Sequence, residues 1–186
     1  MRQFIGAKLS VCLALALAAC SGDPTLKRFK AGAWEIEGKV DRVSDKPNYV
    51  ASILTRSRNY GAEPLALELA NLQLLCFDNA PVVYFKFTEK VGSNRNSRLT
   101  YRFDQNPGHS VTVRILRDSK TIVIENHDDV ARFVDEMRTA SNLIVQVFSL
   151  TQFLSTADFK VEGAQKAIDA VYAGCPLPPV HKPRVS

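Results

Sequence analysis

Residues 98–104 read RLTYRFD, and this stretch decides which kind of fold the chain adopts. Leu99, Tyr101 and Phe103 alternate with polar residues, so in an extended strand the three share one face. The opposite face then carries Arg98, Thr100, Arg102 and Asp104. This period of two predicts a half-buried strand, and QNPGHS at 105–110 predicts a turn directly after it.

Alternation of the same kind recurs on both sides of this stretch. It predicts further strands at 34–40, 49–55, 65–77, 82–89, 111–116, 121–125, 142–150 and 157–163. Turn-forming residues at 44–48 and 78–81 join neighbouring strands by loops of hairpin length. Within 65–77 the apolar positions change phase near Ala70 and Asn71, which predicts a bulge or a break there.

Two late segments change to a helical period. The apolar positions of the first are spaced i, i+3, i+4 and i+7: Val130, Phe133, Val134 and Met137. Asn126 and Asp128 both suit its N-cap, and a second helix is predicted at 163–173 with Gly174 as its C-cap. The pattern predicts a mainly β fold of the α+β class. We expect an antiparallel β-sandwich or partly open barrel of about eight or nine strands, with two late helices packed at one edge.

The N-terminus has the layout of a secretory signal peptide. Arg2 and Lys8 precede an apolar core from Leu9 to Ala19, which is shorter than the roughly 20 residues that a membrane span needs. The segment 17–20, Leu-Ala-Ala-Cys, resembles a bacterial lipobox, in which the cysteine is acylated and becomes the mature N-terminus. The alternative is cleavage by ordinary signal peptidase after the small residue Ala18.

Lipidation at Cys20 would divide the chain into four parts. These are a signal peptide at 1–19, a tether at 20–32, a β-rich domain at 33–175 and a Pro-rich tail at 176–186. Ser21 stands where an aspartate would retain a bacterial lipoprotein in the inner membrane, so we expect the outer membrane with the domain facing the periplasm. Removing Arg2 and Lys8 lowers the formal net charge from +5 to +3, too mild to suggest a nucleic-acid partner.

The cysteines fall into separate roles in this interpretation. Cys12 leaves with the signal peptide and Cys20 takes the lipid. Cys76 and Cys175 remain, in a compartment that oxidises thiols, so a single disulfide is predicted between them. The alternative is a pair of buried free thiols.

No motif in the chain indicates catalysis, a cofactor or a metal. His109, His127 and His181 lie in no ligand-spaced pattern, and ENHDD at 125–129 is best explained as an acidic helix N-terminus. We therefore expect that the protein is not an enzyme. The basic side chains Arg56, Arg58, Arg95 and Arg98 flank two loops and form either a patch for an anionic partner or an ordinary solvated surface.

Several motifs stand in a characteristic order. They are WEIEGKVDRVSDKPNYVASI at 34–53, LQLLC at 72–76, RFD at 102–104, the Phe133-Val134 helix, the strand at 143–147, Phe159, the helix led by Gly163 and the closing Cys175. This order resembles a family of small bacterial envelope proteins that includes the type VI secretion accessory protein VasI. The resemblance covers most of 33–175 and supports the fold and the disulfide. The chain departs from the family at 45–47 and in having a lipobox.

Two functions follow as hypotheses. The first is a non-catalytic, membrane-anchored periplasmic lipoprotein whose β-rich domain binds a protein partner, as accessory to a secretion or envelope assembly. The second is a protective inhibitor or immunity-type lipoprotein that blocks a lysozyme-like enzyme, a toxin or a phage entry step. The sequence leaves the identity of the partner and the oligomeric state open.

Overall fold

The computed structural model describes residues 26–40, 45, 47–60, 68–92, 97–148, 154–177 and 179–180. Ten strands and two helices lie within them. In chain order they are β1 (Leu26–Ala31), β2 (Trp34–Val40), β3 (Pro47–Tyr60), β4 (Leu69–Phe77), β5 (Ala80–Phe87), β6 (Ser97–Phe103), β7 (His109–Ile115), β8 (Thr121–Ile124), α1 (His127–Met137), β9 (Asn142–Phe148), β10 (Leu154–Lys160) and α2 (Ala164–Tyr172).

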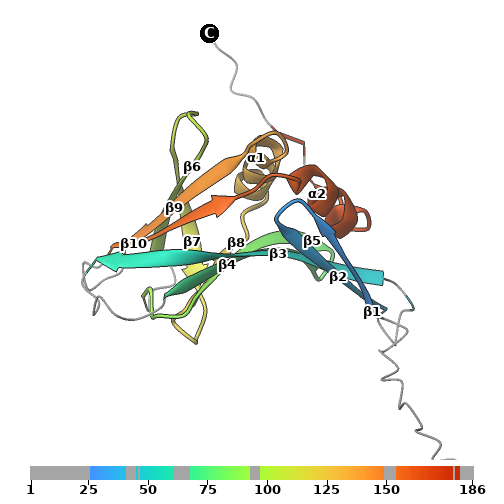
Figure 1. Ribbon diagram of the computed structural model, residues 1–186, viewed down its shortest axis with the longest axis horizontal. Coiled ribbons are helices and arrows are strands. Elements are labelled where there is room, and N and C mark those ends of the chain that lie inside the picture. Colours follow the sequence, from blue (N-terminus) through green and yellow to red (C-terminus); the bar gives the residue numbers. More distant parts are fainter. Residues whose placement is uncertain are drawn as a thin grey trace, which may run out of the picture.

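Eight of these strands close into an antiparallel barrel. The ring runs β3, β10, β9, β6, β7, β8, β5 and β4, and β4 pairs back onto β3 (Figure 1). The long strand β3 makes closure possible, because one of its edges pairs with β4 while the other pairs first with β2 and then with β10. The hairpin of β1 and β2 extends the sheet beyond the ring. The predicted mainly β fold with two late helices is confirmed, and the barrel is closed.

The barrel has two layers, which we name sheet A and sheet B. Sheet A contains β1, β2, β3, β4, β5 and β8, and sheet B contains β10, β9, β6 and β7. Sheet A forms the lower layer in Figure 1 and sheet B rises above it. Helix α2 lies against β1 to β4, and α1 contacts β5 and α2, so the two helices sit together at one end of the barrel.

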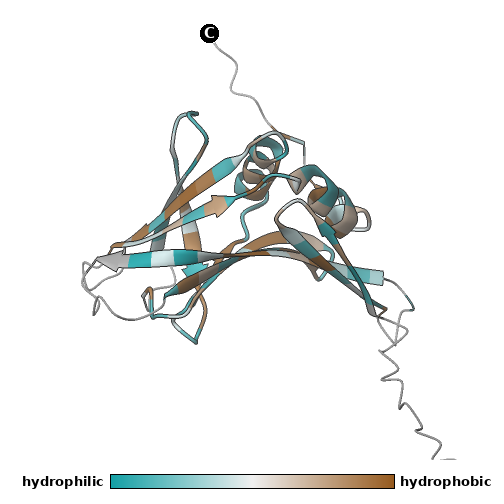
Figure 2. Cartoon of the chain, viewed as in Figure 1, coloured by the Kyte–Doolittle hydropathy of each residue, from teal (hydrophilic) through white to brown (hydrophobic). Residues whose placement is uncertain are grey.

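Apolar side chains from both sheets fill the interior. An eight-stranded barrel has an interior just wide enough for packed side chains, and hydrophobic residues run along the strands of both layers (Figure 2). Phe133 of α1 is fully buried at the centre of an aromatic cluster. Its ring centroid lies 4.9 Å from that of Tyr101, 5.0 Å from Phe103 and 5.9 Å from Phe85. Helix α1 therefore joins the two sheets through their inner faces.

Helix α1 begins where the sequence predicted. The Asn126 side chain accepts hydrogen bonds from the backbone N–H groups of Asp128 and Asp129, both at 3.1 Å. This cap satisfies two of the donors that a helix leaves unpaired at its start. The four apolar positions of the predicted stripe are all buried. The acidic ENHDD segment is thus the start of a helix.

Strand β1 was not predicted, and it moves the start of the folded domain. The segment 20–32 was expected to be a tether, but Leu26–Ala31 pairs along its whole length with β2, so the boundary at 33 is too late. The β1–β2 turn packs against the start of α2 so closely that a Cβ at Gly32 would lie 2.3 Å from the Glu162 carbonyl oxygen. The buried Trp34 indole donates to the Val161 carbonyl at 3.1 Å. The hairpin is therefore part of the core.

Strand β4 is continuous, in contrast to the break predicted near Ala70 and Asn71. Its register with β3 runs without interruption from Leu69 to Leu75, because Ala70, Leu72 and Leu74 face the core in one phase. Residues 61–67, which suggested the other phase, lie outside the described residues. At the end of the strand, Cys76 lies at disulfide-bonding distance from Cys175, with Cα atoms 6.0 Å apart. The predicted pair thus joins α2 to sheet A.

Within the described residues, neither helix has the length and apolar character needed to cross a bilayer.

Candidate functional site

The arginines predicted as an anionic-partner patch are spread over the barrel. Arg58 of β3 and Arg98 of β6 both point outward from the barrel, but β10 and β9 lie between these two strands. Arg58 pairs with Asp158 at 3.2 Å, and Arg98 donates to the Ser110 hydroxyl at 3.1 Å. Arg56 is exposed two residues before Arg58 on the same strand. Arg95 lies outside the described residues. The three described arginines, Arg56, Arg58 and Arg98, therefore do not form a single cluster.

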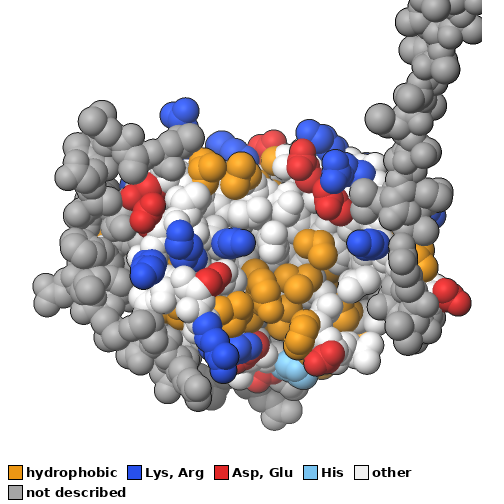
Figure 3. All heavy atoms as spheres, turned by 90° about the horizontal axis from the view of Figure 1, so that it is seen from below, with side chains coloured by type: hydrophobic (Ala, Val, Ile, Leu, Met, Phe, Trp, Pro, Cys, Tyr) orange, Lys and Arg blue, Asp and Glu red, His pale blue; other side chains and the backbone are white. Residues whose placement is uncertain are grey.

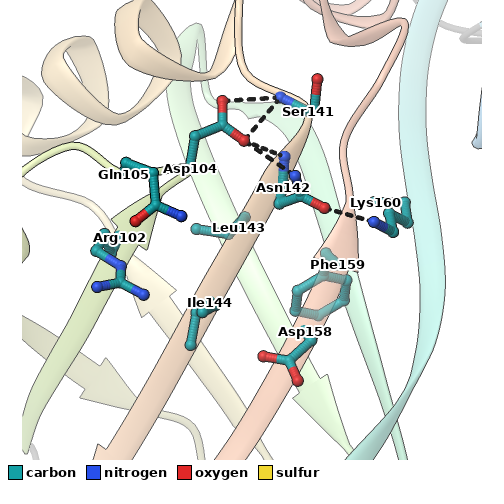
Figure 4. Close-up of a pocket in the computed structure, with 10 residues that line it drawn as sticks. All are labelled: Arg102, Asp104, Gln105, Ser141, Asn142, Leu143, Ile144, Asp158, Phe159 and Lys160. Carbon is teal, nitrogen blue, oxygen red and sulfur yellow. Dashed lines mark hydrogen bonds between the residues drawn. The ribbon is translucent and has the colours of Figure 1, made fainter.

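A hollow of about 560 Å³ lies on the outer face of sheet B, a short distance along the same strands. It is lined from three adjacent strands and the loops that follow or precede them (Figure 4). Its charged and amide side chains are Arg102, Asp104, Gln105, Asn142, Asp158 and Lys160. Ile144 lies between Arg102 and Asp158, to each of which it is directly paired in register. The hollow thus has an apolar centre with polar side chains around it.

Asp104 organises the upper edge of this hollow. It follows β6 with a positive φ of 45°, and its Oδ1 accepts from the Asn142 backbone N–H at 2.9 Å and from the Asn142 side-chain amide at 3.1 Å. Its Oδ2 accepts from the Ser141 N–H at 3.1 Å. These bonds, with that to Ser141 the largest cause, hold the pKa of Asp104 below its ordinary value. The carboxylate is therefore already satisfied by neutral donors.

The hydrogen bonds continue from Asp104 across the sheet. The Asn142 side-chain oxygen accepts from Lys160 Nζ at 2.6 Å, which holds the ammonium group beside the hollow (Figure 4). Arg102 is exposed on the opposite side and makes no hydrogen bond or ion pair with another described residue. The cations that the hollow offers to a ligand are therefore Arg102 and Lys160. Sequence reasoning placed Arg102 on the outer face but did not single out either residue.

A second surface lies on the outer face of sheet A and is apolar. Figure 3 shows hydrophobic side chains gathered at the centre of this face. In register, Val50 is opposite Leu75, Leu75 is opposite Val82, and Tyr84 is opposite Val123. Two large apolar side chains on the same face are strongly exposed, Leu54 at 61% and Phe77 at 58%. We name the surface formed by Val50, Leu54, Leu75, Phe77 and Tyr84 the apolar face; Val82 and Val123 lie on the same side of the sheet but are buried, at 7% and 1% exposed.

Three cations lie near the apolar face, and three acidic side chains on the same side of the sheet are paired. Lys39, Arg56 and Lys86 are exposed and form no ion pair with another described residue. The acids on the same side of the sheet are bound: Glu35 to Lys30 at 3.0 Å, Glu37 to Arg28, and Glu125 to Arg114 at 2.6 Å. Lys39, Arg56 and Lys86 are therefore three cations near the apolar face that no ion pair with a described residue neutralises.

A partly buried polar cluster joins α1 to the β6–β7 hairpin. His109 Nε2 lies 2.8 Å from Glu136 Oε1, and the His109 and Tyr101 rings are 5.2 Å apart. Burial, and next the charge of Glu136, raises the pKa of Tyr101 far above its usual range. The Tyr101 hydroxyl and Glu136 Oε2 have no hydrogen-bond partner among the described residues. Because Tyr101 is only 1% exposed, we assign this cluster to the packing of α1.

The other sequence candidates also have structural explanations. His127 is exposed at the first residue of α1, while Glu125 pairs with Arg114 and Asp129 with Arg132. In the described part of the chain, no group of three or more His, Cys, Asp or Glu side chains is arranged to hold a metal ion. Cys20 and His181 lie outside the described residues.

Comparison with known proteins gives no further information, since no family model, no curated protein and no solved structure matches the chain. The resemblance to the VasI family therefore stays a prediction from the motifs.

Proposed function

We propose that this protein is a non-catalytic lipoprotein, anchored in the bacterial envelope through Cys20, whose barrel binds a protein partner with its apolar face. The observation that carries the proposal is the exposure of Phe77 at one end of this face and of Leu54 at the other, with Val50, Leu75 and Tyr84 between them. Exposed apolar residues are common singly, but a connected patch on a sheet face commonly marks an interaction surface. Burying this face would remove its apolar area from water, which favours association.

The charges around the apolar face indicate which kind of partner would fit. Lys39, Arg56 and Lys86 would lie at the edge of the interface, where complementary charges guide association and select the partner. We therefore expect an apolar patch surrounded by acidic side chains on the partner. Association should slow as salt is raised, because ions screen charges beyond about 8 Å at physiological ionic strength.

The proposed anchor would hold this surface close to the membrane. Residues 21–25 separate Cys20 from the start of β1, and a chain this short spans at most about 20 Å even when extended. Leu26 is opposite Lys39 in the sheet, and Lys39 is opposite Asn48. Phe77 lies two residues beyond Leu75 toward that same end. A partner on the apolar face would thus be met near the bilayer surface.

Partner binding can be tested by crosslinking in intact cells and isolating the full chain from solubilised membranes. We expect a protein that is recovered with the wild type to fall at least tenfold in the double variant Leu54→Asp/Phe77→Asp. Phe29→Asp is the matched control, because Phe29 is 43% exposed but lies on the inner side of the β1–β2 hairpin, opposite Ile36. Equal recovery with the double variant would contradict the proposal.

The identity of the recovered protein separates the two hypotheses about the role. A component of a secretion or envelope assembly supports the accessory role. A lytic enzyme or toxin, captured one to one and inhibited by the purified chain, supports the protective role instead. Either outcome keeps the apolar face as the binding surface.

The anchor is tested separately with Cys20→Ala. Acyl groups on the mature N-terminus bind membranes at about 0.8 kcal/mol per buried methylene, so losing them should release the protein from the membrane fraction. Processing at residue 20 should fail or move to another site. A variant that stays bound to membranes with unchanged processing would show that Cys20 is not the anchor.

A further inference from the structure

We propose that the hollow on sheet B is a second binding site, which takes a short acidic peptide segment in extended form. Arg102 and Lys160 would each bind one carboxylate, and Ile144 would contact an apolar side chain between them. This site adds a class of ligand to the proposed function of protein binding. Binding at this site does not depend on the apolar face.

The placement of the two cations follows from the strand register. Arg102 of β6 and Asp158 of β10 both pair with Ile144 of β9, and Lys160 lies two residues beyond Asp158. Neighbouring strands are about 4.8 Å apart and successive residues about 3.4 Å apart, so the Cα atoms of Arg102 and Lys160 are separated by about 12 Å. Ile144 lies on the strand between them, directly between Arg102 and Asp158 and to one side of the diagonal from Arg102 to Lys160.

This spacing selects the pattern of the ligand. In an extended peptide, residues i, i+2 and i+4 share one face, and i and i+4 are about 13 Å apart. Acidic residues at i and i+4 with an apolar residue at i+2 therefore match Arg102, Lys160 and Ile144. An arginine guanidinium suits this role, because it can bind a carboxylate through two parallel hydrogen bonds.

The acids within the hollow form no ion pair with Arg102 or Lys160, although the charge of Lys160 is the last of the causes that lower the pKa of Asp104. Asp158 pairs with Arg58 outside the hollow, and Asp104 is satisfied by Ser141 and Asn142. Lys160 donates to the neutral Asn142 oxygen and keeps two further N–H donors. The Asp104 network fixes Asn142, and Asn142 orients Lys160, so part of the site is arranged before a ligand enters (Figure 4).

The test is a titration of the isotopically labelled chain, prepared as Cys20→Ala, followed by backbone amide NMR shifts. The probe is the capped pentapeptide Glu-Ser-Leu-Ser-Glu, and the matched control is Gln-Ser-Leu-Ser-Gln. We expect saturable shifts at the residues of β6, β9 and β10 that line the hollow. Arg102→Gln and Lys160→Gln should each weaken binding, the first by at least about tenfold.

Arg98→Gln is the control variant, because Arg98 lies on the same face of the same strand but bonds to Ser110. It should change the dissociation constant less than twofold. Since Arg98, Arg102 and Lys160 are exposed, all three variants should keep the dispersed spectrum of the folded chain. The proposal is overturned if the glutamine peptide binds equally well, if Arg102→Gln binds like the wild type, or if no saturable shift appears in the hollow. None of these outcomes affects partner capture through Leu54 and Phe77.

Discussion

The outer faces of the two sheets differ although both sheets enclose the same core. The outer face of sheet B is polar: Asp158 is paired with Arg58, Asp104 accepts hydrogen bonds from backbone N–H groups, and Ile144 lies at the centre of a hollow. The outer face of sheet A carries exposed Leu54 and Phe77. A sheet that needs only to close a barrel can present polar residues to water on its outside. The apolar face of sheet A therefore requires an explanation beyond stability.

The comparison distinguishes residues that stabilise the barrel from residues that the barrel exposes to a ligand or partner. Substitutions that remove inner-face contacts or the disulfide should lower stability strongly and weaken binding at both outer faces together. Substitutions on an outer face should leave stability almost unchanged and affect one binding function at a time. The predictions below test this division, beginning with the largest effect.

Loss of the Cys76–Cys175 bond should have the greatest effect on stability. The two residues are 99 apart in sequence, and a bond closing such a loop contributes about 4–5 kcal/mol in the chain-entropy model. We expect denaturant unfolding of the double variant Cys76→Ala/Cys175→Ala to show a loss of this size, and addition of reductant to leave the variant unchanged. A stability equal to that of the oxidised wild type would mean that the bond is absent or without effect.

Truncation of Phe133 should come next. Its ring contacts Tyr101, Phe103 and Phe85, so Phe133→Ala leaves a cavity between the two sheets. Such changes cost about 3–5 kcal/mol, and Phe133→Leu should cost less because it refills part of the space. Both binding functions should weaken in parallel with the unfolded fraction. Selective loss of one function would indicate that α1 serves one face rather than both.

Asp104→Asn should have a smaller effect that depends on pH. The folded pKa of Asp104 is below the ordinary 3.8, so its carboxylate stabilises the fold above that pH, and the contribution is lost as pH falls through the folded pKa. The variant should thus be less stable than the wild type at neutral pH, and the two should converge in acid. Urea unfolding at pH 7 and near pH 3 measures this. A difference that does not change with pH would contradict the role of the charge.

The smallest effect on stability should come from the apolar face itself. Leu54 and Phe77 are more than half exposed, so Leu54→Asp/Phe77→Asp should change the free energy of unfolding by about 0.5 kcal/mol or less at each site. Thermal unfolding of the purified variant measures this. A large loss would mean that these side chains support the barrel, and it would remove the reason for assigning them to a partner.

The strands of sheet B were the most predictable part of the molecule. In 98–104 the alternation correctly placed Leu99, Tyr101 and Phe103 inside, and all three are at most 1% exposed. Strand β1 was missed because Lys27, Arg28 and Lys30 interrupt any apolar pattern in LKRFKA. It forms because the turn at Gly32 brings its backbone against β2, where Arg28 and Lys30 pair with Glu37 and Glu35 across the two strands.

The two candidate surfaces were harder to predict for different reasons. Arg102 and Lys160 come together only because β9 pairs with both β6 and β10, a register that the period of two does not specify. The apolar face was hidden because Leu75, Phe77 and Val82 stand within apolar runs of β4 and β5, and a run of that kind is also typical of a strand buried on both faces. The apolar residues of the partner surface can be read in the sequence. They indicate a partner only when the structure shows that no other described element covers that side of the sheet.

Photo-crosslinking in intact cells can show whether the apolar face contacts a protein partner. A photoreactive amino acid at Phe77 in the full chain should give one discrete crosslinked product in intact cells. The same amino acid at Lys166, exposed on α2 and away from both surfaces, should give none. A product from position 166 of the same identity and yield, or no product from position 77, would contradict the account.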